Sequence, residues 1–353
     1  MKNKIITLII PLLLLSASCN LFRKPVFAGV VKTVNGGADW QFSVALKDSK
    51  SGSISGLSVS KLAFDPQNRE IVFAGGYNGG LYKSEDSGAS WKSISPNTNI
   101  PIYDFAFNPY DSKIIYAAGI YNGSGKLIKT TDGAASWEEV YNEASSNNPV
   151  RAVAINPDNP NQLVIGLASG SLIQSADSGL SWKLAQNFND RINRIIWQNG
   201  QVYVTLKTKG LYKSDSAMEN FQNLTETLKN NSSVLSASGN SVEWFNQAFV
   251  DPFSNNLIYL TTDKGLFKST DGGLTWNKLA LPTKQSASEA HGIAIAKTSS
   301  NIVFTSVAAT IYKSTDAGQT WQTQSIDTTG YINYILIDPQ LPQIAYGGIY
   351  VEQ

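Results

Sequence analysis

The sequence predicts an all-β fold, a single seven-bladed β-propeller built from four-stranded antiparallel blades. Three observations predict it. A short turn motif recurs along most of the chain, and its copies begin 39 to 55 residues apart, about the length of one blade. A second turn signature, Asp-Pro or Asn-Pro between two apolar stretches, lies upstream in most periods. Each end of the chain carries half of one repeat.

The chain begins with the features of an export signal. Lys2 and Lys4 precede an apolar run over residues 5–15, which is too short to span a bilayer as a helix. The run leads into Leu-Ser-Ala-Ser-Cys at residues 15–19, where small residues precede Cys19. This segment resembles a bacterial lipobox, in which the cysteine is lipidated and becomes the new N-terminus.

We therefore predict a lipoprotein signal peptide at residues 1–18, lipidation at Cys19, a lipidated tether at 19–28 and the propeller at 29–353. The expected location is extracytoplasmic, with the protein lipid-anchored to a bacterial membrane, and the outer membrane or cell surface is favoured. The alternative is a secreted or periplasmic protein that is cut later, for example after Ala28.

The repeated motif places a hydroxyl residue, an Asp, a Gly and a final Trp at fixed spacing. Such a carboxylate can accept several backbone N–H groups in a tight turn, and the Gly supplies a positive φ. The Trp then opens the next strand and can bury its ring between blades. The copies occupy residues 33–40, 84–91, 130–137, 175–182, 214–221, 269–276 and 314–321, the first and fifth being degenerate. The pattern resembles the Asp-box, or BNR, repeat.

We interpret the box residues as structural and not catalytic. They are Asp86, Trp91, Asp132, Trp137, Asp177, Trp182, Asp271, Trp276, Asp316 and Trp321. The Asp/Asn-Pro turns at 65–66, 108–109, 156–157, 251–252 and 338–339 separate the first two strands of their blades. Each blade therefore runs strand A, Asp-Pro turn, strand B, loop, strand C, Asp-box turn, strand D.

The two ends of the chain complete one blade between them. Residues 331–353 supply strands A and B, whereas residues 29–46 supply strands C and D. Pairing of the N-terminal C–D strands with the C-terminal A–B strands closes the ring and removes the open edges that invite aggregation.

Function is expected on the rim opposite the boxes, where the B–C and D–A connections lie. Alignment of the A strands brings one residue of each blade to the same level, and we call these the mouth positions. They are Ser60, Tyr103, Arg151, Asn193, Asn246, His291 and Asn333. The next position along includes Lys61, Asp104, Arg194, Gln247 and Tyr334.

The candidate ligand-binding residues of this rim are Tyr103, Asp104, Arg151, Arg191, Arg194, Lys207, Lys209, Trp244, His291 and Tyr334. Five of them are cations and could receive an anionic partner, or they form a solvated face compensated by Asp190 and Glu143. Trp244 either anchors the 226–243 insertion in the core or is an exposed binding aromatic.

Composition excludes several classes of function. Lys and Arg number 28 against 27 Asp and Glu, so no global charge favours nucleic acid. A single Cys and a single His exclude an internal disulfide framework, a Cys-cluster zinc site and a multi-His metal site. We predict neither a cofactor nor a metal, and we expect a monomer.

Asp-box propellers include sialidases, xyloglucanases, sortilin-type receptors and photosystem II assembly factors. The combination of turns here most resembles the assembly-factor type and sortilin-like bacterial propellers. The resemblance implies a membrane-anchored, non-catalytic protein-binding or assembly scaffold, whose partner is a protein with an anionic surface. Enzymatic activity is the less favoured expectation.

The alternative is a glycan-binding module or a glycoside hydrolase of the sialidase or xyloglucanase-like type. A hydrolase would draw a carboxylate pair from rim acids such as Asp104, Asp190, Glu243 and Glu289.

Overall fold

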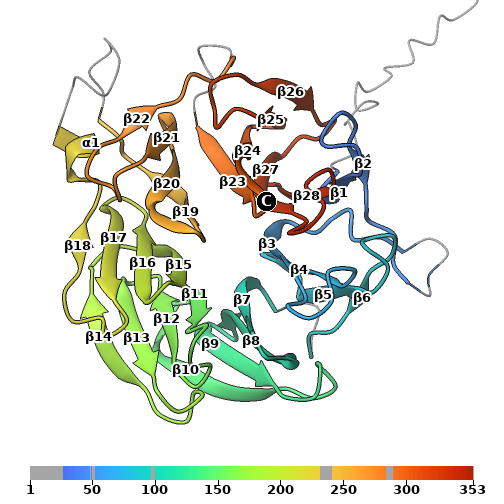
Figure 1. Cartoon of the computed structure of the whole chain (residues 1–353). Helices are drawn as coiled ribbons and strands as arrows, with labels where there is room; N and C mark the ends of the chain where they lie inside the picture. The colour runs from blue at the N-terminus through green and yellow to red at the C-terminus, as the bar shows by residue number, and fades with distance from the viewer. Residues whose placement is uncertain are drawn as a thin grey trace, which may run out of the picture.

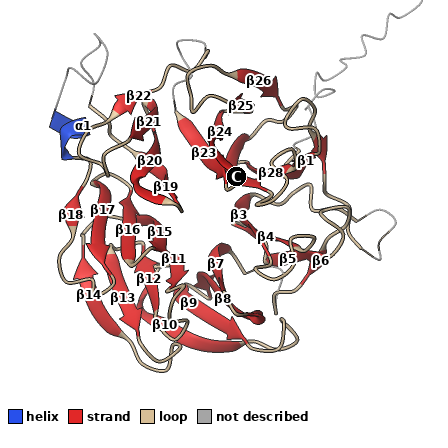
Figure 2. Cartoon of the chain, in the orientation of Figure 1, coloured by secondary structure: helices blue, strands red, loops and turns tan. Residues whose placement is uncertain are grey.

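Seven four-stranded antiparallel sheets stand around a central axis, as Figure 1 shows. This computed structural model describes residues 27–47, 49, 52–96, 100–230, 241–283 and 289–352. Strands dominate these residues, and they include one short helix, α1 (Glu226–Asn230), on the outer side of the ring (Figure 2). The fold predicted from the sequence is confirmed.

In blades one to six, the strands follow one another in chain order from the axis outwards. Blade one holds β3 (Val59–Phe64), β4 (Val72–Gly76), β5 (Leu81–Ser84) and β6 (Lys92–Ser93). Blade two holds β7 (Ile102–Asn108), β8 (Asp111–Tyr121), β9 (Ser124–Thr130) and β10 (Glu138–Ser146). Blade three holds β11 (Val150–Ile155), β12 (Leu163–Leu167), β13 (Ser171–Ser175) and β14 (Lys183–Asn187). Blade four holds β15 (Ile192–Gln198), β16 (Gln201–Leu206), β17 (Gly210–Asp215) and β18 (Gln222–Asn223).

The remaining blades keep this arrangement, and the last one joins the two ends of the chain. Blade five holds β19 (Phe245–Asp251), β20 (Ser254–Thr262), β21 (Gly265–Ser269) and β22 (Asn277–Lys278). Blade six holds β23 (Ala290–Ala296), β24 (Ser299–Val307), β25 (Thr310–Ser314) and β26 (Gln322–Ser325). Blade seven holds β27 (Tyr331–Ile337), β28 (Ala345–Tyr350), β1 (Gly29–Thr33) and β2 (Gln41–Phe42).

Blade seven closes the ring as the half-repeats predict. Strand β1 pairs antiparallel with β28, in a register that runs from Gly29 opposite Ile349 to Thr33 opposite Ala345. The sheet order is β2-β1-β28-β27, so each chain end contributes two strands. The predicted signal peptide and Cys19 lie outside the described residues. Across the residues that are described, no helix has the length and apolar character needed to cross a bilayer.

The Asp-box turns are small hydrogen-bonded cages. In the box of blade five, Asp271 Oδ1 accepts the Ser269 hydroxyl at 2.8 Å and the Thr275 backbone N–H at 2.9 Å, while Oδ2 accepts the Thr275 hydroxyl. Gly273 carries a φ of +94° there, which glycine adopts without strain. In blade two, Ala134 stands at that position with a φ of +77°. The cage geometry therefore dictates the backbone even where the Gly is missing.

The box tryptophans connect neighbouring blades. The indole N–H of Trp276 donates to the Leu224 carbonyl of blade four at 2.7 Å, and that of Trp91 donates to the Ser43 carbonyl of blade seven at 2.8 Å. Both rings are buried, with Trp276 4% exposed. These two rings thus cover apolar surface and satisfy their single donors, whereas the buried indole N–H groups of Trp40 and Trp321 have no partner among the described residues.

Candidate functional site

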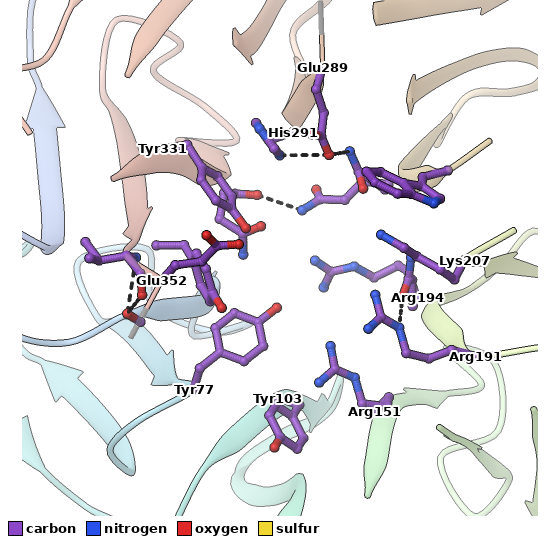
Figure 3. A pocket seen from close by; sticks show the side chains of 18 of the residues that line it. Tyr77, Tyr103, Arg151, Arg191, Arg194, Lys207, Glu289, His291, Tyr331 and Glu352 are labelled. Atoms are coloured by element: carbon purple, nitrogen blue, oxygen red, sulfur yellow. Dashed lines mark hydrogen bonds and ion pairs between the residues drawn. The ribbon is translucent and has the colours of Figure 1, made fainter. Parts of the chain in front are cut away.

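A pocket of about 680 Å³ opens at the centre of the rim that carries the B–C and D–A connections. All seven blades contribute to its wall, and Figure 3 shows their side chains converging on the central space. Of the two rims, this is the one on which the sequence predicts function. We call it the pocket rim, and the opposite one the box rim.

A β-bulge in every inner strand forms the wall of the pocket. In β7, for example, Ile102 and Asp104 face consecutive residues of β8, so Tyr103 is left without a partner. A bulge leaves one residue out of the ladder and re-aims its side chain. The same shift occurs in β3, β11, β15, β19, β23 and β27. The bulged residues are the mouth positions, and all of them except Ser60 line the pocket.

Four mouth positions hold neighbouring blades together. Ser60 Oγ donates to the Ile102 carbonyl at 2.6 Å, and Asn193 Nδ2 donates to the Phe245 carbonyl at 2.7 Å. Asn246 and Asn333 make the equivalent bonds to the inner strands that follow them, at 2.8 and 3.2 Å. In the described part of the chain, the side chains of Tyr103, Arg151 and His291 make no such bond.

Aromatic rings form a continuous arc along one side of the pocket. His291 stacks on Tyr331 with centroids 4.0 Å apart, and Tyr331 lies 5.0 Å from Tyr350. Tyr77 then contacts Tyr350 at 5.1 Å and Tyr103 at 5.6 Å. Burial raises the pKa of Tyr331, so its hydroxyl stays protonated and can donate. The arc offers apolar ring faces together with phenolic hydroxyls.

Cations occupy the side opposite Tyr331. The Arg151 guanidinium lies over the Tyr103 ring at 4.3 Å, and Lys207 lies over the Trp244 ring at 4.5 Å. Arg191 Nε donates to Asn193 Oδ1 at 2.9 Å. Burial lowers the pKa of Arg191, and the like charge of Arg151 lowers it further. Figure 3 shows Arg151, Arg191 and Lys207 directed towards the central space.

Two carboxylates line the pocket among its described residues, Glu289 and Glu352. Glu289 Oε1 accepts a hydrogen bond from Asn246 Nδ2 at 3.1 Å and lies 3.9 Å from His291 Nδ1. Burial lowers the pKa of His291, and the charge of Glu289 partly opposes that effect. Glu352 follows Val351, whose backbone N–H and carbonyl both bond to the Ser58 hydroxyl. Asn246 thus positions the Glu289 side chain, and Ser58 positions the backbone next to Glu352.

A buried charge network lies beneath the pocket. Asp104 Oδ1 accepts Lys61 Nζ at 2.6 Å and lies 3.9 Å from Arg194 Nη1, and Asp104 Oδ2 accepts the Val153 backbone N–H at 3.1 Å. Arg194 in turn lies over the Tyr334 ring at 4.9 Å. Because its oxygens are occupied by this network, Asp104 has a structural role here.

The structure brings most of the predicted rim residues into one pocket. Those that line it are Tyr103, Arg151, Arg191, Arg194, Lys207, Trp244 and His291, and their role in binding remains a prediction. Asp104, Lys209 and Tyr334 do not line it. Lys209 Nζ donates to the Phe188 carbonyl, and Tyr334 lies beneath Arg194. Trp244 is 43% exposed, which favours the binding aromatic over the core anchor.

Sequence reasoning missed several lining residues. Tyr77 and Asn78 belong to a B–C connection, Tyr331 opens β27, and Tyr350 and Glu352 end the chain. None of these holds a mouth position, so alignment of the A strands could not find them. The available signal was the pair Tyr77-Asn78, which follows strand B on the rim expected to carry function.

The described residues contain no cluster of three or more His, Cys, Asp or Glu side chains suited to a metal ion. Glu289 and His291 are the nearest approach to such a group in the pocket, and Asn246 occupies the open side of Glu289.

A seven-bladed ring with Asp-box turns and a central pocket defines the class of protein. It is an Asp-box β-propeller with features of the sortilin and photosystem II assembly-factor types. The family model described as sortilin, neurotensin receptor 3, matches residues 79–244. The model of the photosynthesis system II assembly factor YCF48 matches residues 237–345.

Curated relatives carry a different name. Xyloglucanase Xgh74A of Acetivibrio thermocellus is 24% identical over 274 residues, which cover 72% of this chain and 29% of that protein. A xyloglucanase of Paenibacillus sp is 26% identical over 179 residues, covering 44% of this chain and 17% of its own length. The chain thus spans less than a third of the curated relatives it matches.

Solved structures share the fold. A GH74 xyloglucanase from Xanthomonas campestris superposes with a TM-score of 0.66 at 17% identity, covering 83% of this chain and 51% of that one. YCF48 bound to a D1 peptide superposes with a TM-score of 0.62 at 16% identity, covering 88% and 100%.

The expectation of a non-catalytic protein-binding or assembly scaffold is therefore wrong. The curated relatives are named as polysaccharide-degrading enzymes, and they favour the glycoside hydrolase alternative. That expectation rested on the order of turns, and solved structures named xyloglucanase and YCF48 share this fold. The turn order reports the fold and carries little information about chemistry.

Proposed function

We propose that the central pocket binds a carbohydrate and that the protein is a glycoside hydrolase. The observation that carries the proposal is the coincidence of two features. The curated relatives are named xyloglucanases, and the pocket of this chain holds two carboxylates beside a wall of aromatic rings. A volume of about 680 Å³ lies within the range of roughly 300–1,000 Å³ typical of small-molecule sites.

The wall has the chemistry that a saccharide needs. A pyranose presents apolar C–H faces, which pack on aromatic rings, and hydroxyls, which exchange hydrogen bonds with amides and phenols. Tyr77, Tyr331 and Trp244 offer ring faces and edges together with phenolic and indole polar groups. Asn78 and the Gln247 Nε2 group are held by Ser58, Gly56 and Asn333. Because the three rings come from different blades, one bound sugar can be contacted from several directions.

Hydrolysis of a glycosidic bond needs two carboxyl groups flanking the scissile bond. One protonates the departing glycosidic oxygen, and the other activates water or attacks the sugar carbon. We assign these roles to Glu289 and Glu352. Asp104 is excluded because its Oδ1 accepts Lys61 Nζ. Asp190 is excluded because it accepts the backbone N–H groups of Thr208 and Lys209. An extracytoplasmic location, which the N-terminal residues lead us to expect, would expose the pocket to polysaccharide.

The test measures release of reducing ends from xyloglucan and a panel of other polysaccharides. We expect Glu289→Gln and Glu352→Gln each to lower kcat at least 100-fold while KM changes little, because the carboxyl group acts on the reacting bond. Glu243→Gln is the matched control, since Glu243 is exposed outside the pocket and should leave the rate unchanged.

Two results would overturn parts of the proposal. Full activity in both pocket variants would remove Glu289 and Glu352 from the mechanism. Saccharide binding by calorimetry without any turnover would leave a glycan-binding module and refute the hydrolase.

A further inference from the structure

The pocket carries more positive charge than its own residues neutralise. Its described lining holds four cations against two carboxylates. Among the described residues, no carboxylate oxygen lies within 4 Å of a side-chain nitrogen of Arg151, Arg191 or Lys207. Glu289, Asp263 and Asp190 act on Lys207 from further away, and Asp190 acts on Arg191 in the same way. Asp190 and Glu143 therefore do not form the compensating ion pairs considered from the sequence. Like charges gathered in a partly buried site cost free energy unless a ligand supplies the opposite charge.

The Arg151 guanidinium is directed towards the central space, and its Nη groups make no hydrogen bond within the described part of the chain. Its Nε is buried without a partner, so the Nη groups are the ones that a ligand can reach. The Tyr103 ring fixes the plane of the guanidinium from one side at 4.3 Å, and Tyr77 lies 5.7 Å away. Stacking orients a guanidinium but leaves its N–H groups, which lie in its plane, free to bind.

Arg191 provides a second fork beside the first. Its Nε is held by Asn193, so that the side chain is positioned from within its own blade. Arg151 and Arg191 line the same pocket, and Figure 3 shows both side chains directed towards its central space. The like charge of Arg151 accordingly contributes to the lowered pKa of Arg191. Paired guanidinium groups match the planar, bidentate geometry of a carboxylate.

We propose that the saccharide carries a carboxylate, so that the ligand is a uronic acid residue held by Arg151 and Arg191 with its ring against the aromatic arc. The inference rests on the proposed function, because it names the sugar class of that same pocket. An acidic sugar would distinguish the ligand of this chain from the polysaccharide for which its relatives are named. The enclosed volume favours a sugar residue over an extended protein surface.

The experiment compares one ligand in two charge states by isothermal titration calorimetry. The probes are tetramers of galacturonic and of glucuronic acid, each as the free acid and as its methyl ester, which keeps the sugar and removes the charge. We expect the wild-type protein to bind at least one free acid about tenfold or more tightly than its ester, with an affinity that falls as salt rises.

Arg151→Gln/Arg191→Gln should abolish this preference. Lys92→Gln/Lys183→Gln is the control, since it removes the same charge from exposed outer strands and should retain the preference. Arg151→Lys/Arg191→Lys keeps the charge but lacks the planar forks, and we expect an intermediate preference. This pair tests the inference if the Gln variant fails to fold, which thermal denaturation would show.

The outcomes separate the two proposals. Equal binding of acid and ester overturns the uronic acid and leaves the carbohydrate site standing. Binding of neutral oligosaccharides alone does the same. Failure of every saccharide overturns both, and arginine-dependent capture of a peptide through its C-terminal carboxylate would show a protein ligand in their place.

Discussion

The two rims of this propeller differ in what is repeated from blade to blade. The box rim repeats side chains, whereas the pocket rim repeats a backbone bulge. On the box rim, the same side chains recur from blade to blade and make the same hydrogen bonds, as in the boxes around Asp177 and Asp271. On the pocket rim, the same backbone bulge recurs while its side chain changes from Tyr103 to Arg151 to His291. Repetition of side chains builds the ring, and their variation on a repeated backbone builds the site.

The mouth positions divide along the same line. Four of them donate their side-chain hydrogen bonds to the next blade and therefore have a structural role: Ser60, Asn193, Asn246 and Asn333. Tyr103, Arg151 and His291 make no such bond within the described part of the chain, so their side chains are available to the pocket that they line with the three asparagines. We therefore expect the ligand contacts at the positions that lack the inter-blade bond.

The largest expected effect on stability comes from comparing one tryptophan of the box rim with one of the pocket rim. Trp276→Ala should lower the free energy of unfolding by about 3–5 kcal/mol, because it empties a buried site and leaves the Leu224 carbonyl without its donor. Ligand affinity should be unchanged. Trp244→Ala should cost less than about 1 kcal/mol, since the ring is half exposed, yet weaken ligand binding roughly tenfold.

Urea denaturation and calorimetry measure the two quantities on the same samples. A Trp276 variant that keeps its stability but loses ligand would erase the distinction between the rims.

A smaller effect tests whether the box dictates its backbone. Ala134→Gly should raise the free energy of unfolding by about 1 kcal/mol, because it relieves a β-carbon held at a φ of +77°. Gly179→Ala, at the equivalent place in blade three, should lower it by at least as much, since φ there is +92° and Val140 is close. Thermal denaturation of the reciprocal pair is the measurement. Equal and negligible shifts would mean that the turn adapts to its residue.

The smallest effect concerns acid. Hydrogen bonds from Ser136, Ser181 and Thr275 hold the pKa of Asp132, Asp177 and Asp271 at about 2, below the ordinary value near 3.8. A lowered carboxylate pKa stabilises the folded state above the unfolded pKa, and this contribution is lost as pH falls through about 2. The urea concentration at the midpoint of unfolding should therefore decrease as pH is lowered from 4 to 2, because the box carboxylates become protonated.

The pocket rim should respond at higher pH. Burial lowers the pKa of His291, so the unfolded chain takes up its proton near 6.5 before the folded protein does. Stability should fall slightly from pH 7 to 5, and His291→Gln should flatten that slope while leaving the one below pH 4. Loss of the lower slope in this variant would contradict the assignment.

The sequence predicts the architecture well because the fold is encoded by local turns. Box residues and Asp-Pro turns mark the strands, and the half-repeats at 29–46 and 331–353 predict the closure. The helix α1 in the 226–243 insertion was not predicted, since no periodic pattern marks five residues of a polar stretch.

The site is only half predictable, for a physical reason. Alignment of the repeats finds residues such as Arg151, which occupies a position that recurs at the same level in every blade. It cannot find Tyr350 or Glu352, which reach the pocket because ring closure brings the end of the chain there. Long-range placement of this kind is a property of the assembled ring and not of any one repeat.

Closure also has a consequence for the order of events in the cell. Strand β1 is synthesised before the six whole blades, whereas its partner β28 is synthesised after all of them. Six blades can form as they emerge, while the seventh must wait until β27 and β28 have been synthesised. Until then the edge of β1 that pairs with β28 is bare, so a chaperone can bind the open chain while six blades are synthesised.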